Sequence, residues 1–321
     1  MNPSESTCSA EPELQVPSIQ YDEEWIRETW GWDTPENFIR SQGRNLRPRI
    51  LASLQLAGLQ PGMRILDVGC GRGEVVLHCG RLGIDAVGID YSRPAIELAE
   101  KARASHSPHE RKRMQFVCGD VKDLRTNHLF DLIFMLDLVE HLHDWELSRL
   151  FEICRQLLEP KGVLIIHTLP NKWLYDITYG RILRLFMPWL PPDPRTEKEK
   201  AIHINEMTIT HLAEVLDRSG FEQRVWLDDL LTEQARWHSK QPLSDQRGMV
   251  YRLMAKPFVA MLYKLICKTP ARLLIVNEMF AVAWKAGQEK PIRTPVHLTE
   301  SLVIRIASSK KNRPSAPPIF G

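Results

Sequence analysis

The sequence predicts an α/β fold in which a mostly parallel, seven-stranded sheet is covered by helices and carries helical insertions. From residue 64 onward, short β-branched runs alternate with helical patterns. Several of these runs are continuously apolar, which is typical of strands buried on both faces of a parallel sheet. The runs are RILDV (64–68), DAVGID (85–90), MQFVC (114–118), FDLIFML (130–136), GVLIIHT (162–168), FEQRVWL (221–227) and SLVIRIA (301–307).

The chain divides into a core with a cover, two insertions and two tails. Residues 1–20 and 309–321 are rich in Pro, Ser and charge and are expected to be disordered, and the first of them lack the pattern of a signal peptide or membrane anchor. Residues 21–60 predict an N-terminal helical cover. The core spans 61–229 with an acceptor-side insertion at 171–206, a helical insertion occupies 230–297, and 298–308 supply the final strand.

Composition bounds the class of protein. The 321 residues are 43% hydrophobic and 26% charged, which is typical of an ordinary globular protein. A net charge of +2 gives no general attraction to nucleic acid or another polyanion. The six cysteines form no C-x-x-C pair, which favours a reducing, cytoplasmic location.

Helix boundaries between the strands can be read from capping residues. Ser92 predicts the N-cap of a helix with Pro94 in its first turn. A second helix, 145–158, is expected to end at the turn Glu159-Pro160-Lys161-Gly162, and Thr208 is expected to cap a third over 208–219.

A glycine-rich turn follows the first strand, with Gly69, Gly71 and Gly73 at alternate positions. Glycines are needed there because the backbone turns sharply and approaches a ligand without a Cβ in the way. Asp90 closes the second strand 21 positions beyond Gly69, where its carboxylate can accept both hydroxyls of a ribose. Asp120 closes the third strand and can meet an adenine amino group beside Val121.

The order of D-x-G-x-G-x-G, an acidic residue after strand two, G-D after strand three and D-L-V-E-H-L after strand four resembles the class I methyltransferases over about residues 60–228. The resemblance implies a Rossmann-like sheet with an antiparallel seventh strand and S-adenosylmethionine as cofactor. It also implies that Asp67 lies near the amino-acid end of that cofactor, with the glycines as floor. The implied cofactor residues are Asp67, Gly69, Cys70, Gly71, Gly73, Asp90, Tyr91, Asp120, Val121 and Asp137.

Two other readings of the same turn were weighed. A nicotinamide or flavin dehydrogenase needs G-x-G-x-x-G, whereas here the third glycine comes one residue early and Glu74 would bring a carboxylate near the phosphates. A non-catalytic S-adenosylmethionine-binding module is the other alternative, because a fold does not dictate a function.

Methyl transfer is an in-line displacement, so a base is expected near the ends of strands four and five. Glu140, His141 and His203 are the predicted catalytic residues. The weaker candidates are His143, expected at the surface, His167, expected as a hydrogen-bonded core histidine, and Asn171.

The set Asp137-x-x-Glu140-His141 with the distal His203 also resembles metal-using O-methyltransferases of quinone biosynthesis and small-RNA 3′-end methyltransferases. Asp137 departs from that pattern because it replaces a longer Glu. An enzyme without a metal is the default expectation, and a divalent ion that lowers the pKa of an acceptor hydroxyl is the alternative.

The expected acceptor is a small molecule or a lipid-linked molecule, with O-methylation favoured. The HINE segment at 203–206 also resembles methyltransferases encoded with glycan-assembly enzymes, which adds a sugar or glycolipid acceptor. No N-P-P-Y-type tetrad follows strand four, so methylation of nucleic-acid bases is not expected. The oligomeric state is left open.

Residues 247–285 predict either a lid or a peripheral contact at the inner face of a membrane. No acidic residue occurs between Gln246 and Asn277, and the cations at 252, 256, 264 and 268 would share one stripe of a helix beside a broad apolar face. In the lid alternative the apolar face points inward over the acceptor pocket and the cations are solvated.

Overall fold

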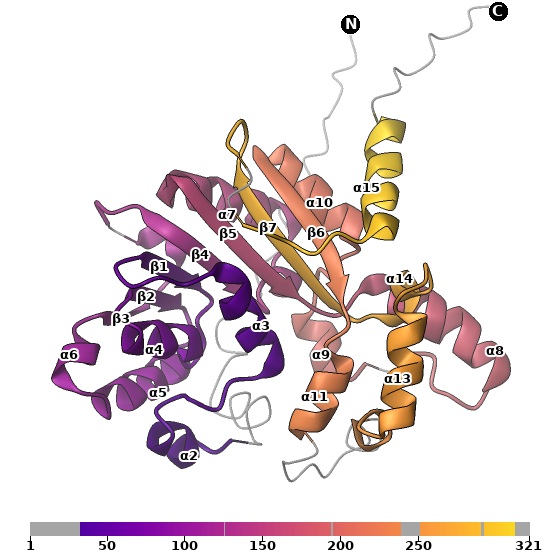
Figure 1. The fold of residues 1–321 in the computed structure, drawn as a ribbon, viewed down its shortest axis with the longest axis horizontal. Helices are drawn as coiled ribbons and strands as arrows, with labels where there is room; N and C mark the ends of the chain where they lie inside the picture. Colours follow the sequence, from indigo (N-terminus) through magenta and orange to yellow (C-terminus); the bar gives the residue numbers. More distant parts are fainter. Residues whose placement is uncertain (1–32, 125, 194, 239–250, 290–291, 312–321) are drawn as a thin grey trace, which may run out of the picture.

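The computed structural model describes residues 33–124, 126–193, 195–238, 251–289 and 292–311, and Figure 1 shows their arrangement. The predicted tail at 1–20 lies outside the described residues. The predicted tail at 309–321 begins too early, because the last helix continues to Lys311.

A seven-stranded sheet forms the centre of the molecule, in the order β3-β2-β1-β4-β5-β7-β6. The first five strands in this order are mutually parallel, and β7 runs antiparallel to both β5 and β6. The predicted α/β fold with an antiparallel seventh strand is therefore confirmed. The strands are β1 (Arg64–Val68), β2 (Asp85–Asp90), β3 (Met114–Cys118), β4 (Phe130–Leu136), β5 (Leu158–Thr168), β6 (Phe221–Asp228) and β7 (Glu278–Lys285).

The prediction of the seventh strand at 298–308 is wrong. That segment lies within the helix α15 (Leu298–Lys311), and β7 occupies residues 278–285, inside the segment predicted as a helical insertion. Residues 279–284 are all buried in β7 between β5 and β6, whereas Leu302 and Ile306 of α15 are exposed. A central strand buried on both faces needs a continuous apolar run, and MFAVAW provides one while SLVIRIA carries Arg305.

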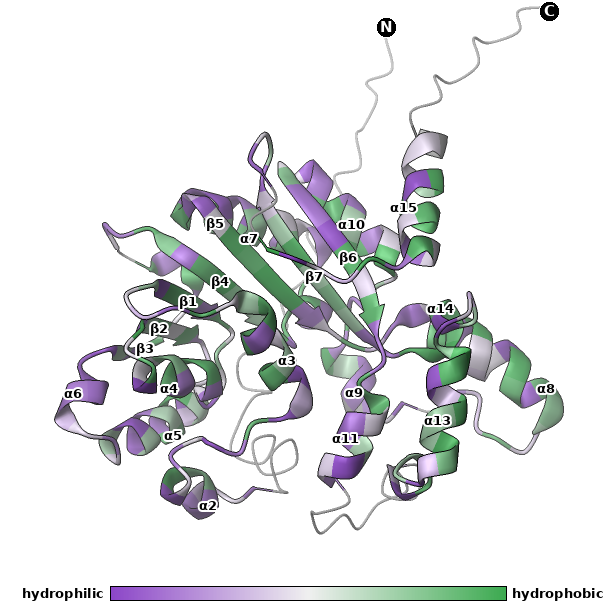
Figure 2. Cartoon of the chain, in the orientation of Figure 1, coloured by the Kyte–Doolittle hydropathy of each residue, from purple (hydrophilic) through white to green (hydrophobic). Residues whose placement is uncertain are grey.

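Helices cover both faces of the sheet, in two separate apolar clusters. One face packs against α3 (Pro48–Ala57), α4 (Glu74–Arg81) and α5 (Arg93–Ala104), and the other packs against α7 (Asp144–Leu157), α10 (Ile209–Arg218) and α15. The predicted caps are confirmed, since Ser92 Oγ accepts from Ala95 N and Thr208 Oγ1 accepts from His211 N. Figure 2 shows hydrophobic colour along β7 and the adjoining later part of β5.

Shorter helices lie outside these layers. They are α2 (Pro35–Arg40), α6 (Pro108–Arg111), and two short helical turns that follow β3 and β4, η2 (Val121–Asp123) and η3 (Val139–His141). The predicted helical cover thus contains α2 and α3 within its described part.

Two insertions lie beyond the carboxyl ends of β5 and β6, toward which the arrowheads point in Figure 1. The first contains the π-helical segment η4 (Leu174–Leu183), α8 (Arg184–Phe186) and α9 (Glu197–Ile202). The second contains α11 (Leu231–His238), α13 (Pro257–Ile266) and α14 (Arg272–Ile275). They contact one another, because Thr178 Oγ1 donates to the carbonyl of Leu274 and Asn171 Nδ2 donates to that of Leu273.

The predicted single basic stripe over 252–268 is not found. Lys256 is the N-cap of α13, Lys268 follows its C-cap, and Pro257 separates Arg252 from this helix. Lys264 Nζ binds Glu233 of α11 at 2.8 Å. Residues 247–250 lie outside the described part of the chain, in which no helix is long and apolar enough to span a bilayer.

Candidate active site

The glycine turn lies where the order of the strands reverses, at the carboxyl ends of β1 and β4. Gly69 and Gly71 have φ angles of +73° and +52°, which favour glycine. The amides of Gly69 and Cys70 both donate to the carbonyl of Ile89, at 2.9 and 3.2 Å. The turn is thereby tied to β2, and its backbone lines a cavity.

Gly73 does not line this cavity, which differs from the predicted cofactor role. Its φ is +87°, and a Cβ there would approach the Phe116 ring to 2.5 Å and the Ala99 Cβ to 3.2 Å. This glycine is required because α4 begins in close contact with β3 and α5.

The Asp90 carboxylate is held at both oxygens. Oδ2 accepts from the amide of Gly71 and Oδ1 from that of Ser92, each at 2.8 Å. Burial raises the pKa of Asp90, while the two amides lower it. Each oxygen keeps a second lone pair, so this fixed carboxylate can accept two further hydroxyl donors, as a ribose diol requires.

Asp67 is 3% exposed and lies beneath the turn in the wall of the cavity. Burial, with Glu74 and Asp90 nearby, raises its pKa well above the ordinary value. A cationic ammonium group beside Asp67 would stabilise its ionised carboxylate and lower this pKa again. Cys70 and Tyr91 line the same part of the cavity, where burial raises the pKa of the Cys70 thiol.

Asp120 and Val121 lie at the end of β3, also in the cavity wall. Asp120 Oδ1 accepts from the amide of Lys122 and Oδ2 lies 3.0 Å from Lys122 Nζ. Val121 is 8% exposed and offers an apolar surface. The Asp120 carboxylate can accept a hydrogen bond from a purine amino group, and Val121 can contact the face of the purine ring.

Asp137 follows β4 with a φ of +56°, and its carboxylate joins two cations. Oδ2 lies 2.6 Å from Arg49 and Oδ1 lies 2.6 Å from Nδ1 of His167, whose Nε2 lies 2.6 Å from Glu278. Although burial opposes it, Arg49 and His167 hold the pKa of Asp137 well below its usual range. Although burial lowers it, Asp137 and Glu278 raise the pKa of His167 to about 9.

His167 is thus a buried, hydrogen-bonded core histidine, as the sequence predicts. Asn171 is buried and donates to the carbonyls of Leu273 and Val276, so it ties the insertions together. His143 is the N-cap of α7. None of these three lines the cavity.

The three predicted catalytic residues come together in the cavity. Glu140 and His141 lie in η3 and His203 is the C-cap of α9, with one ligand atom of each within 4.8 Å of the others. The Nδ1 of His141 lies 3.0 Å from the carbonyl of Ile202, so this nitrogen donates and the lone pair of the neutral ring is on Nε2. Burial and His203 lower the pKa of His141 to about 4.

Glu140 is buried and accepts from the hydroxyl of Thr168 at 2.7 Å. Burial and Asp137 raise its pKa to about 8. One carboxylate and two imidazoles at this spacing can bind a divalent cation or accept a proton. Asp137 is not part of this group among the described residues, because its carboxylate is engaged by Arg49 and His167.

Sequence reasoning missed Arg47 and Arg49, which reach the cavity from the beginning of α3. Burial lowers the pKa of Arg47 to about 9. A guanidinium group here can bind the carboxylate of an amino-acid moiety. The sequence predicts residues 21–60 only as a helical cover, and no local motif marks these arginines.

The cavity has a volume of about 1400 Å³ and continues from the glycine turn to the insertions. Its far part, the acceptor chamber, is lined by the apolar and aromatic side chains of Leu174, Tyr175, Tyr263 and Ile275. Polar side chains, among them Arg195, Glu199 and Gln234, also line it. The volume of the cavity, and the different linings at the glycine turn and at the insertions, suit two ligands bound side by side.

Comparison with known proteins agrees with this geometry. Residues 40–224, more than half of the chain, match the family model described as a methyltransferase domain. The chain is 28% identical over 136 residues to the ubiquinone biosynthesis O-methyltransferase of Bradyrhizobium diazoefficiens. The aligned residues cover 42% of this chain and 50% of that protein. The mitochondrial enzyme of that name from Rattus norvegicus is 39% identical over 121 residues, which is 37% of this chain and 34% of that protein.

The chain spans about half the length of the first curated relatives that it matches. Among solved structures, magnesium protoporphyrin IX methyltransferase from Synechocystis PCC 6803 with bound S-adenosylhomocysteine has a TM-score of 0.50 and 15% identity, over 84% of this chain and 98% of that chain. A mycolic acid cyclopropane synthase complexed with S-adenosylhomocysteine and CTAB has a TM-score of 0.50 and 19% identity, over 74% of this chain and 83% of that chain. These two likenesses establish the fold.

The family match covers the glycine turn, Asp90, Asp120 and the Glu140-His141 pair, and it sets aside the dehydrogenase alternative. The chain belongs to the class I methyltransferases, and its cofactor is S-adenosylmethionine.

Proposed function

We propose that this chain methylates a hydroxyl group of a small-molecule or lipid-linked acceptor that binds between the two insertions. The observation that carries the proposal is the single cavity that joins the glycine turn to the Glu140, His141 and His203 group and to the apolar chamber beyond it. The described residues fit the cofactor. Asp67 suits its ammonium group, Asp90 suits its ribose diol, and the glycine backbone allows it to approach closely.

The cofactor supplies an electrophilic methyl group. Asp67, Arg49 and Asp90 line the cavity and would hold its polar groups. The acceptor's hydroxyl loses its proton at the Glu140, His141 and His203 group. Either Nε2 of His141 accepts the proton, because Nδ1 donates to the Ile202 carbonyl, or the group holds a divalent ion that lowers the pKa of the hydroxyl, and the proton passes to solvent. His203, beside His141 with ring centroids 4.9 Å apart, positions the acceptor.

The relatives support transfer to oxygen, because those reported above are named O-methyltransferases. The apolar lining of the chamber supports an acceptor with an apolar body. A sugar or glycolipid acceptor, suggested by the HINE segment, is the second candidate, and nucleic acid is not an expected acceptor. The proposal includes a cytoplasmic location and a peripheral contact of residues 247–285 with the inner face of a membrane.

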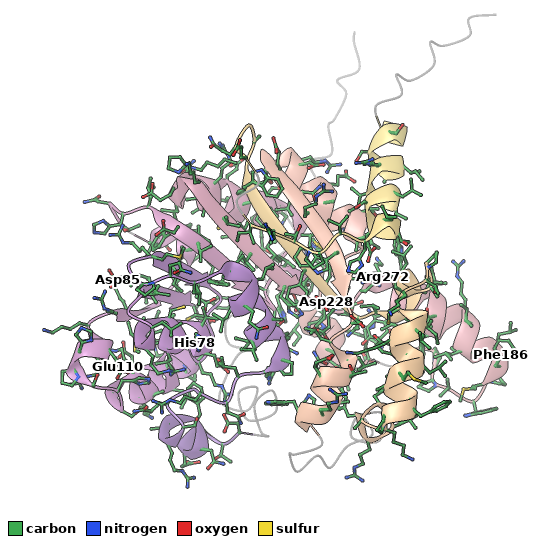
Figure 3. All side chains as sticks on the ribbon, viewed as in Figure 1. His78, Asp85, Glu110, Phe186, Asp228 and Arg272 are labelled. Atoms are coloured by element: carbon green, nitrogen blue, oxygen red, sulfur yellow. The ribbon has the colours of Figure 1, made fainter. Side chains whose placement is uncertain are left out.

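The first test measures cofactor binding. Asp90→Ala removes two charge-assisted hydrogen bonds to the ribose, so calorimetry with S-adenosylhomocysteine is expected to show binding weaker by about 2–4 kcal/mol. Asp85→Ala is the matched control, because Asp85 begins the same strand but is exposed at the opposite end, with a surface ion pair to Arg113 (Figure 3).

Equal affinity of Asp90→Ala and the wild type, with both variants folded by circular dichroism, would contradict the cofactor placement. Binding of cofactor without methylation of any hydroxyl compound in an acceptor screen with labelled methyl donor would instead favour the non-catalytic alternative.

A further inference from the structure

Exposed apolar side chains are concentrated in two short segments. Of the nineteen large apolar residues that are exposed in the described part of the chain, eleven lie in 182–189 and 253–266. Soluble proteins rarely expose apolar groups in such concentrations unless the surface binds something.

The exposed residues of α13 form a stripe. Phe258, Met261, Leu262 and Leu265 follow the spacing of one helix face and are 70%, 53%, 48% and 51% exposed. The opposite side of the helix is buried at Ala260 and lines the cavity at Tyr263. The lid alternative, with the apolar face inward, is therefore wrong for this stripe.

A second stripe of exposed apolar side chains lies around α8 in the first insertion. It consists of Ile182 at the end of η4, Leu185 and Phe186 in α8, and Trp189 in the turn that follows, and the last three are 76%, 73% and 73% exposed. In Figure 3, Phe186 lies at the extreme edge of the molecule and points away from it. Figure 2 shows hydrophobic colour over α8 and parts of α13 at this end.

The two stripes belong to one body beside the acceptor chamber. Thr178 of η4 donates to the carbonyl of Leu274 in α14, which links the two insertions. Tyr175 of η4 and Tyr263 of α13 line the same cavity. Tyr175 and Tyr263 thus lie at the cavity, whereas the stripes of the same two insertions are exposed to solvent.

Within the two segments that carry the stripes, every charged residue is a cation. No acidic residue occurs in 177–192 or in 251–277. The cations Arg181, Arg252, Lys256 and Lys268 are exposed beside the stripes, whereas Lys264 is engaged by Glu233. A flat partner that accepts apolar side chains and is itself anionic matches this combination.

We propose that the stripes on α8 and α13, with Arg181, Arg252, Lys256 and Lys268 around them, form a docking surface for an anionic lipid bilayer. Phe186, Trp189 and Phe258 enter the acyl region, and the cations bind headgroups. Docking places the acceptor chamber beside the bilayer, from which a lipid-linked acceptor enters. The membrane contact of α13 and the entry of a lipid-linked acceptor rest on the proposed function, and the role of the α8 stripe goes beyond it.

The test uses the full-length protein and vesicles of phosphatidylcholine with 30% phosphatidylglycerol, and vesicles of phosphatidylcholine alone. Sedimentation at low salt is expected to show binding to the anionic vesicles at least tenfold tighter than to the neutral ones. Binding should weaken as salt rises, because exposed charges more than about 10 Å apart are screened at 0.1 M. Phe186→Asp/Phe258→Asp should reduce binding at least tenfold, and Lys256→Gln/Lys268→Gln should lower both binding and its dependence on salt.

Leu298→Asp/Leu302→Asp is the matched control, because these residues are 83% and 59% exposed on α15, outside the surface. It should bind vesicles as the wild type does. Unchanged affinity for S-adenosylhomocysteine shows that each variant is folded and keeps this readout separate from the methyltransferase proposal. The proposal is overturned if the wild type does not sediment with anionic vesicles at low salt, or if the Phe186/Phe258 variant binds them equally well. A wild-type dimer that Phe186→Asp/Phe258→Asp dissociates, without vesicle binding, would assign the surface to a second copy instead.

Discussion

At the residue scale, the site depends on buried charges that come from distant parts of the sequence. Arg49 of the N-terminal cover, Asp137 after β4, His167 in β5 and Glu278 in β7 form one continuous chain of ion pairs. In this chain of ion pairs, Asp137 and Glu278 each have a cationic partner, which is the condition under which such charges are tolerated. The chain of ion pairs fixes the wall of the cavity between the cofactor end and the acceptor end.

His167 predicts a specific pH dependence of stability. Its folded pKa of about 9 exceeds the unfolded value of about 6.5, so its contribution is fully present below pH 6.5 and is lost as pH rises through 9. The difference in unfolding free energy between wild type and His167→Gln, from urea titrations, should shrink by about 3 kcal/mol from pH 6 to pH 9.5. A constant difference would show that the imidazole is neutral in the folded protein.

The Glu140, His141 and His203 group predicts metal binding, in contrast to the metal-free default from the sequence. One carboxylate with two imidazoles suits a divalent ion, and the Nδ1 of His141 already has a backbone carbonyl as its partner. Calorimetry should detect Mn²⁺ binding that Glu140→Gln and His203→Ala each weaken at least tenfold. EDTA should abolish activity, and Mg²⁺ or Mn²⁺ should restore it.

The control for the metal experiment is His143→Ala, because His143 lies in the same segment but outside the group. Absence of Mn²⁺ binding together with full activity in EDTA would contradict the prediction and leave His141 as a base without a metal.

At the scale of elements, the position of β7 determines where the second insertion ends and how it is anchored. The insertion ends at β7, which supplies Glu278 to the ion-pair chain and lies between β5 and β6. The segment between β6 and β7, which includes α13, is therefore attached to the sheet at both ends. This anchoring keeps α13 beside the acceptor chamber.

The corrected strand can be tested by one pair of substitutions. Val282→Asp places a charge at a fully buried position in β7 and is expected to cost more than about 4 kcal/mol or prevent folding. Leu302→Asp lies on the exposed side of α15 and should change stability by less than about 1 kcal/mol. Urea denaturation monitored by circular dichroism measures both, and the reverse order of effects would restore the strand at 301–307.

At the scale of the whole molecule, the cavity lies where all parts of the chain meet. The N-terminal cover contributes Arg49, the sheet edge contributes the glycine turn and Asp90, and the insertions contribute Tyr175 and Tyr263. The predicted segments are therefore parts of one binding site. The outward face of the same insertions carries the apolar stripes, so the acceptor chamber and the proposed bilayer surface share their elements.

The sequence by itself determined the parts of this protein that depend on local order. Six of the seven strands, the caps at Ser92 and Thr208 and the cofactor turn follow from apolar periodicity, hydrogen-bonding side chains and glycine spacing, which act over a few residues. The convergence of Glu140 and His141 with His203 followed from the resemblance to metal-using O-methyltransferases, since His203 lies at the end of α9 and not at the end of a strand.

Only the tertiary structure decided which apolar run becomes the seventh strand, that Gly73 serves packing against Phe116, and that Asp137 binds Arg49 and His167. It also decided that the apolar face of α13 points outward. Each of these depends on contacts between residues far apart in the chain, where burial and charge pairing outweigh local propensity.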